Sequence, residues 1–304
     1  MDQEAERWVI VGLGEVLWDE LPGGRRLGGA PANFAYHARA LGAEAVVVSC
    51  VGEDEAGDEI LVRLAAAGID IRHVAVDPLH PTGRAMVALD AAGAPAFVIA
   101  GEAAWDHIPW DAGLGALARR ADVVCYGTLA QRSPVSRCTI RSFLDGTRRH
   151  CLRLCDANLR SPHYDRPTVH ELLRRTNVLK LSEEELDAVA GLLDIQGSED
   201  GLLAELAHRY SLLMIVLTRG AAGSRLFAPL ESARHPGIAA RVVDTVGAGD
   251  SFGAAVAVGL LHGWPLDLVG ARANRLASFV CTQAGAMPPI PADLAVPFHR
   301  RPGG

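Results

Sequence analysis

Short apolar runs alternate with longer amphipathic stretches along most of the chain. The runs are rich in β-branched residues, a pattern typical of strands that are buried on both faces. The longer stretches repeat their apolar positions about every three or four residues, as helices packed on a sheet do. This alternation predicts an α/β fold with a mostly parallel central sheet and helices on both of its faces.

Individual elements follow from the same pattern. A helix is expected over 31–42, because Pro31 suits a first helical turn and Gly42 suits a helix end. Strands are expected at 8–14, 45–52, 121–127, 151–156, 177–181 and 212–220. Further helices are expected at 54–67, 134–145, 168–175, 183–191 and 199–209.

Two segments interrupt the alternation. Residues 12–27 are rich in glycine and mixed in polarity, and residues 84–99 predict a β-hairpin that turns near residue 93. A hairpin inserted in this way is a candidate lid over a site, although an ordinary edge hairpin has the same pattern. We therefore expect one domain over 1–304, with lid segments near 12–27 and 84–99.

Charge and composition narrow the class of protein. The net charge is −7, acidic and basic residues are mixed, and no basic block predicts a nucleic-acid or membrane partner. The six cysteines form no CxxC pair, and the N-terminus lacks the apolar core of a signal peptide. A reduced, cytoplasmic protein is expected.

The segment 242–263 carries the strongest chemical signal. A strand-like Val-Val pair leads into a glycine-rich turn, and a helix of small apolar residues begins near Ala248. Gly247 and Gly249 let backbone N–H groups converge on an anion at the helix N-terminus. Asp250 in the first turn could take a proton from a phosphoryl acceptor, although an Asp there also simply complements the helix dipole.

A second motif, LGGAPANFA, follows Asp19 by a few residues. Gly28 and Gly29 would let a polyhydroxylated ligand lie against backbone, and Asp19 could accept from vicinal hydroxyls. Asn33 can both donate and accept. Taken alone, two glycines before a helix are also a common turn.

Together these motifs resemble the two signatures of the ribokinase-like (PfkB-type) carbohydrate kinases. GEVLWDELP, PTGRAMVALD, AWDHIPW, YGTLAQRS, DANLR, VLKLSEEEL and LTRGAAGS occur in family order over nearly the whole chain. GEVLWDELP followed by GGAPANFAYHA is most similar to bacterial fructokinases. The resemblance implies a ribokinase-like fold and ATP-dependent phosphorylation of a primary hydroxyl, with D-fructose giving fructose 6-phosphate.

The resemblance also implies roles for individual residues. Asp250 matches the catalytic base, and the anion hole matches Gly247, Ala248 and Gly249. The implied sugar site consists of Asp19, Gly28, Gly29, Asn33, Phe97, Gln131 and Arg160. The implied nucleotide site consists of Thr218, Gly220, Gly223 and Asn274.

Metal ions and a partner are implied in the same way. Glu185 matches a residue that orders Mg²⁺ through water, but Ser182 stands where the family has Asn. Asp244 matches a residue that helps to hold a monovalent cation such as K⁺ in some members. A homodimer formed through the β-lid is also implied.

Other functions stay open. The acceptor could be ribose, a nucleoside or a keto-deoxy sugar acid, whose carboxylate Arg160 could pair with, and a non-catalytic sensor of sugar or nucleotide is a further alternative. A dinucleotide-binding enzyme is disfavoured, because Leu17 stands at the third glycine position and Glu15 where a pyrophosphate would lie. A P-loop kinase is excluded, since the only lysine, Lys180, lies outside such a motif and is more simply a snorkelling or salt-bridged side chain.

Overall fold

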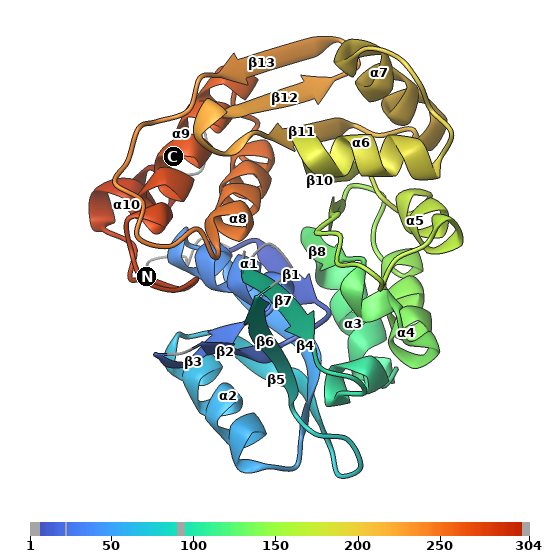
Figure 1. Cartoon of the computed structure of the whole chain (residues 1–304), viewed down its shortest axis with the longest axis vertical. Coiled ribbons are helices and arrows are strands. Elements are labelled where there is room, and N and C mark those ends of the chain that lie inside the picture. The colour runs from blue at the N-terminus through green and yellow to red at the C-terminus, as the bar shows by residue number, and fades with distance from the viewer. Residues whose placement is uncertain (1–6, 22, 90–94, 300–304) are drawn as a thin grey trace, which may run out of the picture.

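The structure, a computed structural model, describes residues 7–21, 23–89 and 95–299 (Figure 1). Within these residues the central sheet has nine strands. Their spatial order is β13 (Glu231–His235), β12 (Ser224–Ala228), β11 (Met214–Thr218), β10 (Val178–Ser182), β9 (Leu152–Asp156), β8 (Val123–Gly127), β1 (Val9–Leu13), β4 (Glu44–Gly52) and β5 (Asp70–Asp77).

Neighbouring strands from β11 to β5 are parallel, whereas β12 and β13 extend the sheet as an antiparallel hairpin. The prediction of a mostly parallel sheet is confirmed. The strands β5, β12 and β13, toward the two ends of the sheet, were not predicted: β5 and β13 mix exposed and buried positions, and β12 is a short antiparallel strand whose last two residues are only partly buried. Edge strands need not carry the continuous apolar run that identified the others.

Helices cover both faces of the sheet, as predicted. One face packs on α1 (Ala30–Ala40), α8 (Ala248–Leu261), α9 (Leu266–Cys281) and α10 (Ala292–His299), with α2 (Glu55–Ala66) beside them. The other face packs on α3 (Ala112–Arg120), α4 (Pro134–Asp145), α5 (Arg166–Leu173), α6 (Glu183–Leu192) and α7 (Glu199–Tyr210). In β1 the side chain of Ile10 faces the first group, and those of its neighbours Val9 and Val11 face the second.

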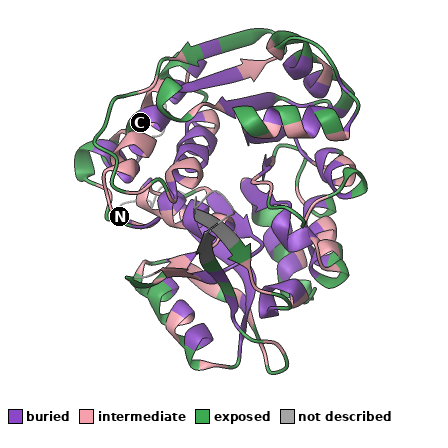
Figure 2. Cartoon of the chain, viewed as in Figure 1, coloured by how far each residue is buried: buried purple, intermediate pink, exposed green. Residues whose placement is uncertain are grey.

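Burial is greatest where helix and sheet meet, and Figure 2 shows α8 buried along most of its length. Small side chains such as Ala254 and Ala255 let this helix pack closely on its neighbours. Among the described residues no helix is both long and apolar enough to cross a lipid bilayer.

A second sheet, called here the small sheet, consists of β3 (Gly24–Gly28), β2 (Leu17–Leu21), β6 (Gly83–Leu89) and β7 (Pro95–Ile99) in that order. Its strands come from the two segments expected to form a lid, and β6 and β7 pair antiparallel. The turn expected near residue 93 lies outside the described residues. Trp18 fixes the small sheet to α2, since its indole Nε1 donates to the Ala56 carbonyl at 3.0 Å.

The expectation of a strand-like segment at 242–243 is wrong. Val242 and Val243 lie in the loop before α8, with 60 % and 61 % of each residue exposed. The Val243 N–H donates to the Cys281 carbonyl at the end of α9 rather than to a strand. Their β-branched side chains therefore reflect neither sheet pairing nor core packing.

Candidate active site

A cavity of about 420 Å³ lies between the small sheet and the carboxyl ends of the central strands. Ligands of open α/β sheets bind at this end of the strands. The lining residues are Glu15, Leu17, Asp19, Gly29, Ala30, Asn33, Ala85, Ile99, Leu129, Asp156, Asn158, Arg160, Lys180, Ser182, Glu185, Thr218, Thr245, Val246, Gly247, Gly249 and Asp250. Residues of both sequence motifs, among them Gly29, Asn33, Gly247 and Asp250, therefore meet in one cavity.

Asp250 lies in the first turn of α8 and lines this cavity. One of its oxygens, Oδ2, accepts a 2.7 Å hydrogen bond from Nδ2 of Asn33. The pKa of Asp250 is raised to about 6. Burial is the main cause and the negative charge of Asp156 acts in the same direction, whereas Lys180 and the hydrogen bond from Asn33 lower the pKa. A carboxylate with a pKa near neutral is suited to general-base catalysis.

The turn before Asp250 requires glycine. Gly247 caps α8 with φ of 80°, and a Cβ there would lie 2.6 Å from the Ala286 backbone. The first-turn N–H groups of a helix have no partner four residues back and carry part of the positive end of its dipole. Gly249 brings the backbone of this turn close to Lys180, because a Cβ at that position would lie 3.1 Å from Nζ of Lys180. The turn fits an anionic group such as a phosphate.

Lys180 is salt-bridged, as the sequence analysis expected for this residue. Its Nζ donates to Oδ2 of Asp156 at 2.7 Å, and both side chains are buried. Burial, the largest single cause, lowers the pKa of Lys180, but the charge and hydrogen bond of Asp156 together with the charges of nearby carboxylates outweigh it and raise the pKa to about 12. Lys180 therefore stays cationic in the cavity, within reach of an anion held by the α8 turn.

On the side of the small sheet, two glycines allow close contacts, one with the carboxylate of Asp19 and one with the backbone of Glu15. A Cβ on Gly28 would lie 2.3 Å from Oδ2 of Asp19, and one on Gly29 would lie 2.5 Å from the Glu15 carbonyl oxygen. Burial raises the pKa of Asp19 to about 6, which the nearby Arg160 partly offsets. Arg160 is exposed at the rim of the cavity.

Among the described residues, Gln131 and Asn274, expected in the sugar and nucleotide sites, do not line the cavity. Gln131 is buried and donates to the Gly127 carbonyl at 3.0 Å. Asn274 in α9 donates to Oγ of Ser224 and to the Gly270 carbonyl, both at 2.7 Å. Phe97 lies in β7, and its side chain is outside the described part of the chain.

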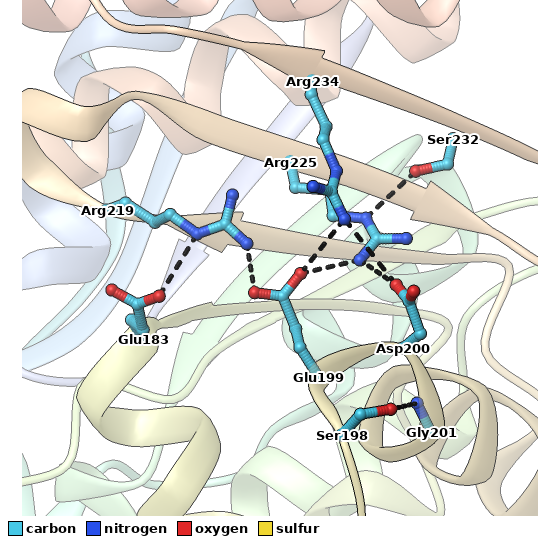
Figure 3. A network of polar contacts seen from close by, with 9 residues as sticks. All are labelled: Glu183, Ser198, Glu199, Asp200, Gly201, Arg219, Arg225, Ser232 and Arg234. Atoms are coloured by element: carbon cyan, nitrogen blue, oxygen red, sulfur yellow. Dashed lines mark hydrogen bonds and ion pairs between the residues drawn. The ribbon is translucent and has the colours of Figure 1, made fainter.

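The expected nucleotide turn follows β11. Thr218 lines the cavity, whereas Gly220 and Gly223 form the short helical turn just beyond it. Figure 3 shows how ion pairs fix this turn: Arg219 pairs with Glu183 and Glu199, at the starts of α6 and α7. Arg225 in β12 extends the network to Glu199 and Asp200. A rigid turn at the cavity edge is suited to holding a ligand in one position.

Glu185 lines the cavity and is held by backbone groups at both oxygens. Oε1 accepts from the Leu159 N–H at 2.7 Å and Oε2 from the Ser182 N–H at 2.8 Å. Ser182 Oγ accepts from the Glu185 N–H at 3.2 Å, so that Ser182 caps α6 and orients Glu185. Each Glu185 oxygen keeps a lone pair, which fits a role in ordering water on a metal ion.

Asp244 is already paired with a cation. Its Oδ2 accepts from Nη1 of Arg26 at 2.7 Å and from the Gly285 N–H at 3.0 Å, and Oδ1 accepts from the Val246 N–H at 3.1 Å. A monovalent cation at this carboxylate would have to share it with Arg26 or displace Arg26.

Comparison with known proteins identifies the family. The model of the pfkB family of carbohydrate kinases matches residues 22–293. The chain belongs to this family. As a carbohydrate kinase it is a phosphotransferase that acts on sugars, and the cavity built around Asp250 is its candidate active site.

Three relatives of this carbohydrate kinase are informative. A fructokinase of Klebsiella pneumoniae is 30 % identical over 302 residues, which are 93 % of this chain and 95 % of the relative. The crystal structure of sugar kinase PH1459 of Pyrococcus horikoshii in complex with ATP has a TM-score of 0.75 and 26 % identity, and covers 91 % and 94 % of the two chains.

The third relative shows the fold alone. Fructokinase of Vibrio cholerae O395, bound to fructose, ADP and a calcium ion, has a TM-score of 0.80 and 23 % identity over 95 % of this chain and 98 % of that one. The ribokinase-like fold expected from the sequence is confirmed.

Several residues of the cavity were not predicted from the sequence, and three of them carry polar side chains close to the candidate site. Asp156 was not singled out, although it ends an apolar strand at the edge where the site forms. Asn158, with a φ of 36°, follows it on the same loop. Glu15 was considered only as an obstacle to pyrophosphate, and yet it is buried in the cavity wall. A polar residue just after a buried strand was the available signal.

Proposed function

We propose that this carbohydrate kinase transfers the γ-phosphoryl group of ATP to the 6-hydroxyl of D-fructose. The observation that carries the proposal is the position of Asp250, a buried carboxylate with a raised pKa, in the same turn as the Gly247 N-cap of α8. One turn thus supplies a proton acceptor and a site for the migrating phosphoryl group. The fructokinase relatives support fructose as the sugar.

In this mechanism Asp250 takes the proton of the acceptor hydroxyl while Asn33 holds its Oδ2. The hydroxyl oxygen forms a bond to the γ-phosphorus, and the bond to the β–γ bridging oxygen breaks, so that ADP leaves with the electron pair. The α8 turn and Lys180 stabilise the negative charge on the phosphoryl oxygens. Asp19 and Gly29 orient the sugar.

Mg²⁺ bound with ATP would neutralise phosphate charge. Glu185, oriented by Ser182, would hold it through water, and Thr218 would lie beside the nucleotide. Gly220, Gly223 and Asn274 would act behind the cavity wall rather than in it. Gln131 would likewise act indirectly, since it braces the end of β8.

The proposal also includes a monovalent cation bound at Asp244. Comparing initial rates in K⁺ and Na⁺ buffers tests whether such a cation takes part in the reaction.

The experiment that tests the proposal is a coupled ADP-release assay over fructose, ribose, a keto-deoxy sugar acid and a nucleoside. We expect the highest kcat/KM with fructose. A higher value with another acceptor would assign the kinase to that acceptor, and the exposed Arg160 makes the sugar acid the most informative competitor. Sugar binding without ADP release from any acceptor would favour a sensor.

The proposal includes a homodimer formed through the small sheet. Met86 in β6 and Val98 in β7 are paired across the hairpin and are 50 % and 45 % exposed. Their neighbours Ala85 and Ile99 line the cavity, so the exposed pair lies on the outer face. Met86→Glu should shift a dimer toward monomer in sedimentation velocity.

A cytoplasmic location is also proposed, in keeping with six free cysteines.

A further inference from the structure

Two hydrogen-bond acceptors in the cavity wall are buried and have no partner within the described residues. They are Oε2 of Glu15 and Oδ1 of Asn33, whose residues are only 3 % and 4 % exposed. Both residues line the cavity that contains Asp250. A buried acceptor without a donor costs free energy, so natural proteins rarely keep one without a reason.

These acceptors define what a ligand must supply. Asn33 already uses its Nδ2 to donate to Asp250, so its remaining atom can only accept. An ionised Glu15 can only accept as well. A ligand that satisfies both must present O–H or N–H donors toward this wall. Vicinal hydroxyl groups of a polyol meet that requirement, whereas a carboxylate or phosphate offers further acceptors.

The charges around the cavity point the same way. Its acidic lining residues are Glu15, Asp19, Asp156, Glu185 and Asp250. Its basic lining residues are Arg160 and Lys180, and Lys180 is already neutralised by Asp156. An anionic group on the acceptor sugar would approach uncompensated carboxylates in a poorly solvated space, where like charges repel strongly.

We propose that Glu15 is a substrate-binding residue that accepts a hydrogen bond from a hydroxyl of an uncharged polyol and excludes acceptors that carry a carboxylate or phosphate. This inference rests on the proposed kinase function and assigns the substrate class of the same site. It places the specificity element on the loop after β1, in the cavity that the Gly247 turn also lines.

The electrostatics of the cavity agree with this role. The pKa of Glu15 is raised to about 7, mainly by burial and also by the negative charge of Asp250. A hydrogen bond from the backbone N–H of Glu15 itself lowers the pKa and offsets part of this rise. A hydroxyl donor from the substrate would supply the stabilisation that the ionised form lacks. Binding of a polyol would thereby restore the carboxylate to its ordinary charged state.

Two substitutions test the role of Glu15. Glu15→Gln keeps the shape and removes the charge, and Glu15→Leu also removes the acceptor. We expect KM for fructose to rise about tenfold in Glu15→Gln and more in Glu15→Leu, because a charge-assisted hydrogen bond is lost, while kcat changes by less than about threefold. Fructose affinity measured by calorimetry without nucleotide should fall by the same factors. The exposed Glu53→Gln serves as the matched control and should change neither constant.

Specificity is the second readout. In Glu15→Gln the value of kcat/KM for gluconate or fructose 6-phosphate should itself rise, because repulsion of the anion is relieved. Its ratio to the value for fructose should therefore rise by more than the roughly tenfold that the higher KM for fructose alone would give. A merely structural role would change the melting temperature without moving this ratio. Unchanged KM and an unchanged ratio in both variants would overturn the inference.

The failure of this inference and that of the proposed function are distinguishable. If the wild-type protein prefers another neutral sugar, the fructose assignment fails and the role of Glu15 stands. If it prefers a sugar acid or sugar phosphate, the role of Glu15 fails and the kinase function stands. If no acceptor releases ADP, the kinase function fails, and calorimetry with neutral and anionic sugars still decides the role of Glu15.

Discussion

The Asn33 side chain donates a 2.7 Å hydrogen bond to Asp250, across 217 residues of sequence. It joins α1, which follows the small sheet, to the first turn of α8. The bond fixes one carboxylate oxygen and leaves the other for an acceptor hydroxyl. The two sequence motifs thus meet in one cavity, in the arrangement that the proposed mechanism uses.

Replacing Asp250 by Asn should abolish most of the turnover. The amide keeps the shape but cannot take a proton, so kcat should fall about a hundredfold to ten-thousandfold. Sugar affinity measured by calorimetry should stay close to that of the wild type, and the circular dichroism spectrum should not change. Turnover near the wild-type rate would rule out Asp250 as the base.

The rate should depend on pH through Asp250. Burial raises the pKa of this carboxyl to about 6, and only the ionised form can accept a proton. The value of kcat/KM should therefore fall as pH drops below about 6 and level off above about 7. Because Asp250 interacts with Asp156 and Glu15, the midpoint belongs to the coupled groups. A flat profile over this range, with the fold intact, would contradict the prediction.

Asp19→Ala should act mainly on sugar binding. Loss of a charged acceptor should raise KM for the sugar about tenfold to a hundredfold, with a smaller change in kcat. Glu20→Ala is the matched control, because Glu20 is the next residue of β2, faces the other side of the strand and pairs with Arg84. Steady-state kinetics on both variants measures the difference. Equal KM values in the two variants would remove Asp19 from the site.

Gly247→Ala should damage both stability and catalysis. The new Cβ would collide with the Ala286 backbone, and φ of 80° disfavours any L side chain. We expect a loss of about 1–3 kcal/mol in unfolding free energy together with a large fall in kcat. Gly191→Ala in α6 is the control, since nothing lies within 4 Å of its Cβ and helix propensity predicts a small gain. Denaturant unfolding should give opposite signs for the two variants.

Glu15→Gln should stabilise the protein in a pH-dependent way. The pKa of Glu15 rises from 4.5 to about 7 in the folded chain, so wild-type stability is lost as pH rises through this window. The charges that face Glu15 are those of Asp250, Arg160 and Asp156. This pKa shift corresponds to a gain of at most about 3 kcal/mol in the unfolding free energy of the variant. The buried Gln amide reduces the gain, because its hydrogen-bonding groups are only partly satisfied. The melting temperature of the variant should exceed that of the wild type by a few degrees at pH 8 and match it near pH 5. An equal gain at both values would contradict the prediction.

Much of the fold could be predicted because its signals are local. The apolar runs of β1, β4, β8, β9, β10 and β11 and the positions of most helices follow from periodicity, Pro31 and Gly42. The glycines at 247 and 249 likewise marked a turn, in which the φ of 80° at Gly247 and its contact with the Ala286 backbone leave no room for a Cβ. The exposed Val242 and Val243 show the limit of this reasoning, because β propensity does not reveal whether a partner strand is available.

By itself, then, the sequence determined the order of strands and helices, the glycine turn before α8 and the presence of Asp250 within it. Only the tertiary structure decided which charges meet, because pairing and burial depend on contacts between distant segments. It placed Lys180 on Asp156 and Asn33 on Asp250, and it buried Glu15 with no donor for Oε2 among the residues that the structure describes. The pKa of each carboxyl follows from its surroundings, which no local pattern along the chain specifies.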